Sequence, residues 1–116
     1  MTELRKESCV ACRADSPRVT NEEVTQLHSI VPEWSISNEK GIFHLDRTFK
    51  FEDFEQAITF ADLVGKTAEE EDHHPRLTVE WGSVKVAWWT HKIKGLHRND
   101  FIMAAKSDEI YGKPAN

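Results

Sequence analysis

Residues 69–91 read EEEDHHPRLTVEWGSVKVAWWTH, and this stretch decides the fold of the chain. Apolar and polar residues alternate over residues 77–81 and again over residues 84–91, as they do in strands with one buried face. Residues 82–83, Gly and Ser, fit the tight turn of a hairpin. The stretch therefore predicts two antiparallel strands, and the end of the second strand returns to the start of the first.

A helix precedes this hairpin. Apolar residues recur at spacings of three and four over residues 51–68 and predict an amphipathic helix. Four consecutive acids, residues 69–72, oppose the helix dipole and destabilise this helix end. Residues that destabilise a helix end without a visible structural benefit indicate a place to look for function. Glu70 and Glu71 by themselves indicate only a solvated helix end. The apolar stripe consists of Phe51, Phe54, Ala57, Ile58, Ala61, Val64 and Ala68.

The remaining elements continue the alternation of helices and hairpins. Thr20 and Glu23 have the spacing of a capping box that opens a helix, and Pro32 ends that helix. Residues 34–49 predict the first hairpin, and a final helix begins near Asn99. This order predicts an α+β fold, namely a two-layer sandwich in which helices cover one face of an antiparallel four-stranded sheet.

Size and composition limit the class of protein. The 116 residues fit a single domain, which we place at residues 20–116 behind a flexible N-terminal arm at residues 1–19. The net charge is −5 and no basic block is present, so nucleic-acid binding is not expected. No apolar run approaches the roughly 20 residues of a membrane helix, and the N-terminus has no signal-peptide pattern. We therefore expect a cytoplasmic protein that does not bind membranes.

The arm contains a CxxC pair, Cys9 and Cys12. A structural zinc site would need two more ligands at suitable spacing, and the nearest histidine is His28. A thioredoxin-like motif would need a preceding strand, whereas the preceding residues are polar. We interpret the pair as two thiols in a loose arm.

Three histidines are expected to converge. His73 and His74 precede Pro75, which favours an extended backbone. His91 ends the second strand of the hairpin, and counting from the turn places it opposite roughly residue 74. A histidine cluster can offer a protonated and a neutral ring near neutral pH, and so supply an acid at one atom and a base at another.

Simpler interpretations stand beside this one. Adjacent histidines before proline can form a solvent-exposed loop, and three histidines can also bind catalytic zinc. Against zinc, the HExxH spacing is absent, and adjacent residues seldom reach one ion. Asp100 can cap the last helix or serve the site. The other histidines, His28, His44 and His97, have the pattern of half-buried structural residues. Among the tryptophans, Trp34 is the one we expect at a substrate, because it opens a strand beside a loop.

The histidine segment resembles the pterin-4a-carbinolamine dehydratases. The pattern of that family is an acid, three residues, His, then His or Asn, then Pro, Cys or Ser. An aromatic residue follows after five or six residues, His or Trp after nine more, and Asp after eight or more. The matching residues are Glu69, His73, His74, Pro75, Trp81, His91 and Asp100. The match extends over residues 20–111, and the arm with its CxxC resembles bacterial members that work beside phenylalanine hydroxylase.

The resemblance implies a reaction and a set of residues. The reaction is loss of water from 4a-hydroxytetrahydropterin to give quinonoid dihydropterin, in tetrahydropterin recycling, with the pterin as substrate and with no cofactor or metal. It also implies homodimers or homotetramers and a functional link to phenylalanine hydroxylase. The catalytic residues would be His73, His74 and His91, and the substrate-binding residues would be Glu69, Pro75, Thr90 and Asp100, besides Trp34. The chain departs from many relatives at Leu77, where they have an aromatic, and at His97, where they have a hydroxyl residue.

A second hypothesis is a protein-binding module on the same fold. Animal relatives also act as dimerisation factors for a transcription factor, through a helical surface. Phe101, Ile102, Met103 and Ile110 give the last helix here enough apolar area for self-association or for a partner. A relative that only binds proteins should tolerate loss of the histidine pair, whereas this sequence contains all three rings.

Overall fold

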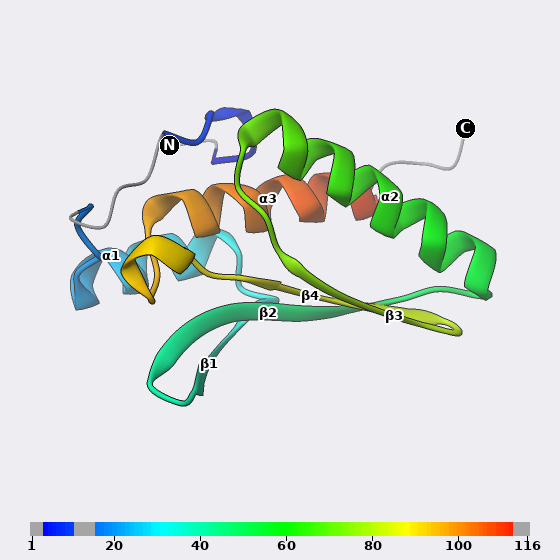
Figure 1. Cartoon of the computed structure of the whole chain (residues 1–116), viewed down its shortest axis with the longest axis horizontal. Coiled ribbons are helices and arrows are strands. Elements are labelled where there is room, and N and C mark those ends of the chain that lie inside the picture. Colours follow the sequence, from blue (N-terminus) through cyan, green and yellow to red (C-terminus); the bar gives the residue numbers. More distant parts are fainter. Residues whose placement is uncertain (1–3, 11–15, 113–116) are drawn as a thin grey trace.

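The computed structural model describes residues 4–10 and 16–112, and in it helices cover one face of a four-stranded sheet (Figure 1). The two-layer α+β fold predicted from the sequence is therefore confirmed. In chain order the elements are η1 (Leu4–Lys6), α1 (Asn21–Ile30), β1 (Ser35–Glu39), β2 (Ile42–Lys50), α2 (Phe54–Glu71), β3 (Arg76–Glu80), β4 (Ser83–Trp88), η2 (His91–Ile93) and α3 (Arg98–Gly112).

The sheet has the order β1-β2-β4-β3, and each neighbouring pair is antiparallel. Strand β4 is central, and its alternate residues Val84, Val86 and Trp88 are completely buried under the helices. This alternation, read from the sequence, places the apolar face of the sheet toward the core.

The second hairpin is shorter than the sequence predicts. Its turn is formed by residues 81–82, and Gly82 adopts a φ of +78°, which favours glycine. Arg76 pairs with Ala87, so the same register would place residue 74 opposite residue 89 rather than 91. The strand ends at Trp88 because the chain then closes a small loop, in which Thr90 and Gly95 exchange two backbone hydrogen bonds of 2.8 and 3.4 Å. His91 therefore belongs to η2, beyond the strand.

The helix caps explain where α1 and α2 begin. The predicted capping box is present, since Thr20 Oγ1 accepts from the Glu23 N–H and the Glu23 carboxylate accepts from the Thr20 N–H. Helix α2 starts at Phe54 because Asp53 caps it. The predicted stripe on α2 is partly wrong, because Phe60 is buried while Phe54 and Ile58 are 47% and 45% exposed. None of the described helices is both long and apolar enough to span a bilayer.

Helix α3 is buried on two sides, because η1 packs on it opposite the sheet. Leu4 of η1 is 1% exposed, and Phe101, Ile102 and Met103 of α3 are each 2% exposed or less. Most of the apolar area that the sequence suggested for a partner is thus already covered within the chain, whereas Ile110 is half-buried. The boundary at residue 20 and the flexibility of the arm stay predictions, although the described part of the arm packs against α3. Cys12 lies outside the described residues.

Candidate active site

The three predicted histidines line one pocket of about 450 Å³. The pocket lies where the end of α2 and the loop after it meet the segment that follows β4. Its lining residues, which we call the histidine pocket, are Cys9, Val10, Glu71, Asp72, His73, His74, Thr90, His91 and Lys92. Two segments far apart in the sequence thus contribute rings to a single cavity.

The end of helix α2 directs the histidine pair. Asp72 adopts a left-handed conformation, with φ 51° and ψ 44°, which stops the helix. The next N–H, that of His73, donates to the Ala68 carbonyl at 3.1 Å. The chain then leaves in an extended path in which neighbouring side chains point apart. As a result the side chain of His73 is 8% exposed, and that of His74 is 53% exposed.

His73 is held by a buried carboxylate. Its Nε2 lies 2.7 Å from Asp100 Oδ1, and Asp100 is completely buried. The second oxygen, Oδ2, accepts from the Thr90 hydroxyl at 2.8 Å and from the His97 N–H at 2.9 Å. The imidazole also stacks on Trp88, with ring centroids 5.9 Å apart. Because an ionised carboxylate only accepts hydrogen bonds, this contact favours the tautomer of His73 with a proton on Nε2.

His74 and His91 occupy more open positions. His74 Nε2 lies 2.6 Å from Glu69 Oε1, and both side chains are exposed. His91 packs against Trp89 at a centroid distance of 4.5 Å, and Trp89 in turn stacks on the buried His44 at 4.1 Å. The three rings therefore meet three different surroundings, namely a buried carboxylate, an exposed carboxylate and an indole.

Two of the remaining histidines are buried in the structure. Burial lowers the pKa of His97 below its ordinary value, and the Asp100 carboxylate opposes this effect. Burial likewise lowers the pKa of His44, and the Glu39 carboxylate opposes it. His97 Nδ1 accepts from the Asn99 N–H at 3.0 Å, so its neutral form caps α3. These contacts give both residues a structural place outside the histidine pocket.

The structure does not bring every predicted substrate-binding residue to the pocket. Thr90 lines it, and Glu69 reaches it through His74. Trp34 lies in the core, 1% exposed, and its indole N–H donates to Asp108 at 2.8 Å. Both carboxylate oxygens of Asp100 are engaged inside the protein, so Asp100 supports His73 from behind. Pro75 follows the pair and is not part of the lining.

Sequence reasoning missed the other lining residues. Glu71 was interpreted as a solvated acid, yet its Oε1 accepts from the Cys9 N–H at 2.7 Å. The two residues are 62 positions apart, and no local pattern connects them. Lys92 and Val10 were likewise not nominated. Among residues 4–10 and 16–112, no three His, Cys, Asp or Glu side chains are placed to hold a metal ion.

The fold and pocket define a class of small α+β proteins that carry a histidine cluster suited to acid–base chemistry. Residues 17–110 match the family described as Pterin 4 alpha carbinolamine dehydratase, and the chain belongs to this family. It is 52% identical over 111 residues, 96% of this chain and 98% of the relative, to the "Putative pterin-4-alpha-carbinolamine dehydratase" of Saccharophagus degradans. It is 54% identical over 107 residues, 92% of each chain, to the "Putative pterin-4-alpha-carbinolamine dehydratase 1" of Gloeobacter violaceus.

A solved structure has the same fold. The transcriptional coactivator/pterin dehydratase from Brucella melitensis superposes with a TM-score of 0.74 at 31% identity. The superposition covers 83% of this chain and 100% of that one. Family membership supports a pterin carbinolamine dehydratase.

Proposed function

We propose that the chain removes water from 4a-hydroxytetrahydropterin and releases quinonoid dihydropterin, with the three pocket histidines as acid and base. The observation that carries this proposal is the convergence of His73, His74 and His91 on one pocket, with His73 held by the buried Asp100. Family membership supplies the class of substrate.

The chemistry needs only proton transfers. In the substrate, carbon 4a bears a hydroxyl group and is bonded to the ring nitrogen N5. Protonation of the hydroxyl lets it leave as water while the ring nitrogen lone pair forms the new double bond. A base then takes a ring N–H proton, so atoms and charge balance. Imidazoles supply both functions near neutral pH.

The surroundings of the rings suggest different contributions. His73 is the best positioned, because Asp100 holds its Nε2, and we propose Nδ1 as the nitrogen that reacts. His74 and His91 are exposed at the pocket and can adjust to the substrate as it binds. We propose that His73 carries out the proton transfer that requires the most exact placement, and that His74 and His91 take part in the remaining proton transfer.

Single alanine substitutions test the proposal. We expect His73→Ala, His74→Ala and His91→Ala each to lower kcat for dehydration of 4a-hydroxytetrahydropterin by about 100–10,000-fold, the range of lost acid–base catalysis. His28→Ala is the matched control, because His28 lies outside the pocket with its Nε2 on the Trp34 carbonyl. Rates near wild type in all three pocket variants would end the proposal. The spontaneous dehydration rate is the baseline.

We further propose that the reaction serves tetrahydropterin recycling after phenylalanine hydroxylation, with tetrahydrobiopterin or a similar pterin as the cofactor being restored. A coupled assay tests this. Purified phenylalanine hydroxylase should sustain tyrosine formation longer at limiting pterin when this chain is added, and a His73→Ala variant should add nothing. An equal time course with and without the chain would separate it from this pathway.

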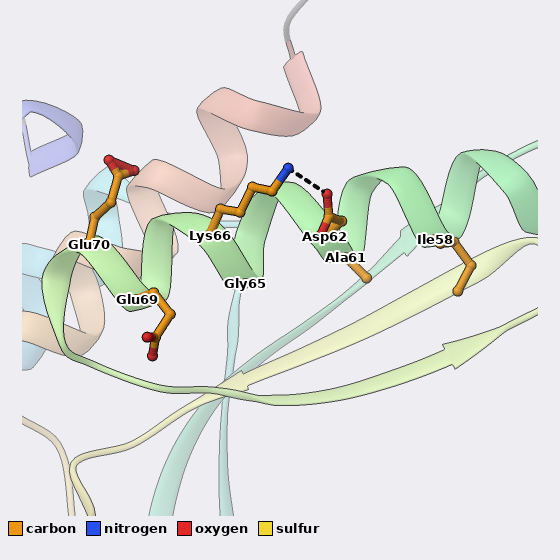
Figure 2. Close-up of a pocket in the computed structure, with 7 residues that line it drawn as sticks. All are labelled: Ile58, Ala61, Asp62, Gly65, Lys66, Glu69 and Glu70. Atoms are coloured by element: carbon orange, nitrogen blue, oxygen red, sulfur yellow. Dashed lines mark ion pairs between the residues drawn. The ribbon is translucent and has the colours of Figure 1, made fainter.

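We also propose that the chain forms homo-oligomers through α2. While Phe101, Ile102 and Met103 of α3 are covered inside the chain, Phe54, Ile58 and Leu63 of α2 remain 45–47% exposed. Figure 2 shows Ile58, Ala61 and Gly65 along a shallow groove on this helix, beside the Asp62–Lys66 ion pair. We expect Ile58→Lys to reduce the assembly mass in light scattering, while Thr59→Lys, one position along, leaves it unchanged. An unaltered mass for Ile58→Lys would place the contact elsewhere.

A further inference from the structure

We propose that residues 4–10, which we call the strap, form one wall of the histidine pocket and limit the size of the substituent at carbon 6 of the pterin. This inference rests on the proposed function and adds a specificity element to it. The strap lies before the segment that matches the family, which spans residues 17–110.

The strap is anchored along the outer side of α3. Leu4 inserts into the core with 1% exposure, and the Arg5 guanidinium forms an ion pair with Glu109. Arg98 then donates two hydrogen bonds, of 2.9 and 2.7 Å, to the Glu7 carboxylate. Bidentate pairs of this type fix orientation as well as distance. The backbone at residues 4–7 is thus held at both ends of α3.

The end of the strap is fastened at the pocket itself. The Val10 N–H donates to Asn99 Oδ1 at 3.1 Å, and Asn99 Nδ2 donates back to the Val10 carbonyl at 2.8 Å. Asn99 is only 1% exposed, so this amide is a fixed part of the core. The Cys9 N–H donates to Glu71 Oε1 at 2.7 Å, and Glu71 is itself a lining residue of the pocket. These contacts leave the Val10 side chain 62% exposed while it lines the pocket.

The same turn of α3 holds both the strap and the catalytic ring. Asn99 binds Val10, and the next residue, Asp100, binds His73. The wall formed by Cys9 and Val10 is therefore fixed relative to His73. A wall that is fixed relative to the acid–base group can discriminate between substrates by size.

The geometry of the substrate relates this wall to carbon 6. In the carbinolamine, carbon 4a is bonded to N5, and N5 is bonded to carbon 6. Any substituent on carbon 6 thus leaves the ring two bonds from the carbon that loses its hydroxyl. Imidazole rings that reach the hydroxyl and N5 of the substrate must also lie near this substituent. Among the residues that line the pocket, we propose Val10 as the apolar side chain that the substituent meets.

A bulky residue at position 10 tests the inference. We expect Val10→Trp to lower kcat/KM about tenfold for a substrate with a three-carbon side chain at carbon 6, and less than about threefold for the 6-methyl substrate. Ser8→Trp is the matched control, because Ser8 is an exposed strap residue outside the pocket lining. Circular dichroism and melting temperature show whether either variant alters the fold.

The outcomes separate this inference from the proposed function. If wild type does not accelerate dehydration, the proposed function fails. If wild type is active but Val10→Trp behaves like Ser8→Trp, or lowers kcat/KM equally for both substrates, the strap does not select the substituent.

A second measurement does not depend on Val10→Trp folding. In a Cys12→Ser background, 7,8-dihydrobiopterin should slow alkylation of Cys9 by iodoacetamide at least fivefold, because Cys9 lines the pocket that the pterin would fill. Unchanged alkylation at saturating pterin would overturn the placement of the strap beside the substrate.

Discussion

At the scale of single residues, the Asp100 carboxylate joins three parts of the chain. One oxygen faces His73, and the other accepts from Thr90 and from the His97 N–H. A carboxylate that is completely buried needs hydrogen-bond partners, and these three contacts supply them. We therefore propose that Asp100 is a positioning residue, which acts on the substrate through His73.

Replacing this carboxylate by an amide separates positioning from binding. We expect Asp100→Asn to lower kcat by about 100-fold, since the amide no longer stabilises a protonated His73 or fixes its tautomer. The dissociation constant of 7,8-dihydrobiopterin should change less than about threefold, and fluorescence titration measures it. If kcat stays at the wild-type level, Asp100 has only a structural role.

His97 shows how a residue can be structural and still respond to pH. Its pKa is lowered by burial, so the unfolded chain takes up a proton more readily than the folded chain. The stability that it contributes is complete above its ordinary pKa of 6.5 and is lost as the pH falls below that value. Protonation of Nδ1 would also remove the acceptor for the Asn99 N–H.

Two variants at position 97 check this account by urea denaturation. His97→Ser keeps an acceptor for the Asn99 N–H but removes the imidazole that takes up a proton. We therefore expect the unfolding free energy of this variant to fall less than that of wild type between pH 7.5 and 5.5. His97→Ala removes the cap and should cost about 1 kcal/mol at pH 7.5. The buried His44 adds to the same trend, so some pH dependence persists. A slope in the Ser variant equal to that of wild type would contradict the assignment.

At the scale of elements, the acidic C-terminal end of α2 lowers the stability of the fold and lies beside the histidine pocket. Asp72 is left-handed and charged at a helix C-terminus, where a negative charge opposes the dipole. We expect Asp72→Asn to stabilise the fold by about 0.5 kcal/mol, because asparagine accepts this conformation without the charge. Thermal unfolding measures the change. Glu70→Gln removes a charge from the same helix end without changing the left-handed residue, so it measures the contribution of charge alone. If Asp72→Asn is less stable than wild type, the Asp72 carboxylate makes a net favourable contact.

The positions of the helices and strands could be predicted from the sequence better than which side of each is buried. Alternation in residues 77–88 is a local signal, and it gave the second hairpin and its buried side. The face of α2 was less accessible to prediction, because Phe54 and Phe60 are equally apolar and only the packed sheet makes Phe60 the buried one. The end of β4 was missed for a similar reason, since the backbone bonds between Thr90 and Gly95 have no residue signature.

At the scale of the whole molecule, the N-terminal segment is part of the fold. The sequence around Leu4 is highly polar, so no periodic pattern marks its burial. The convergence of the three histidines could be predicted from the hairpin, although its register places residue 89, not residue 91, opposite residue 74. The wall formed by residues 9–10 could not, since its contacts with Asn99 span 89 positions of sequence.

Leu4 should contribute to global stability. We expect Leu4→Ala to lower the free energy of unfolding by about 2–3 kcal/mol, because it removes a buried side chain from between η1 and α3. Val10→Ala, at an exposed position of the same strap, should change it by less than about 0.5 kcal/mol. Urea denaturation followed by tryptophan fluorescence compares the two. Equal changes in the free energy of unfolding for the two variants would indicate that residues 4–10 are a loose arm.

The docking of the strap on α3 has a consequence for biosynthesis. Residues 4–10 find their partners on α3, with Arg5 and Glu109 separated by 104 positions. Val10 can meet Asn99, and His73 can meet Asp100, only after α3 has been synthesised. We therefore expect variants truncated before α3 to lack an ordered histidine pocket, however much of the sheet they contain.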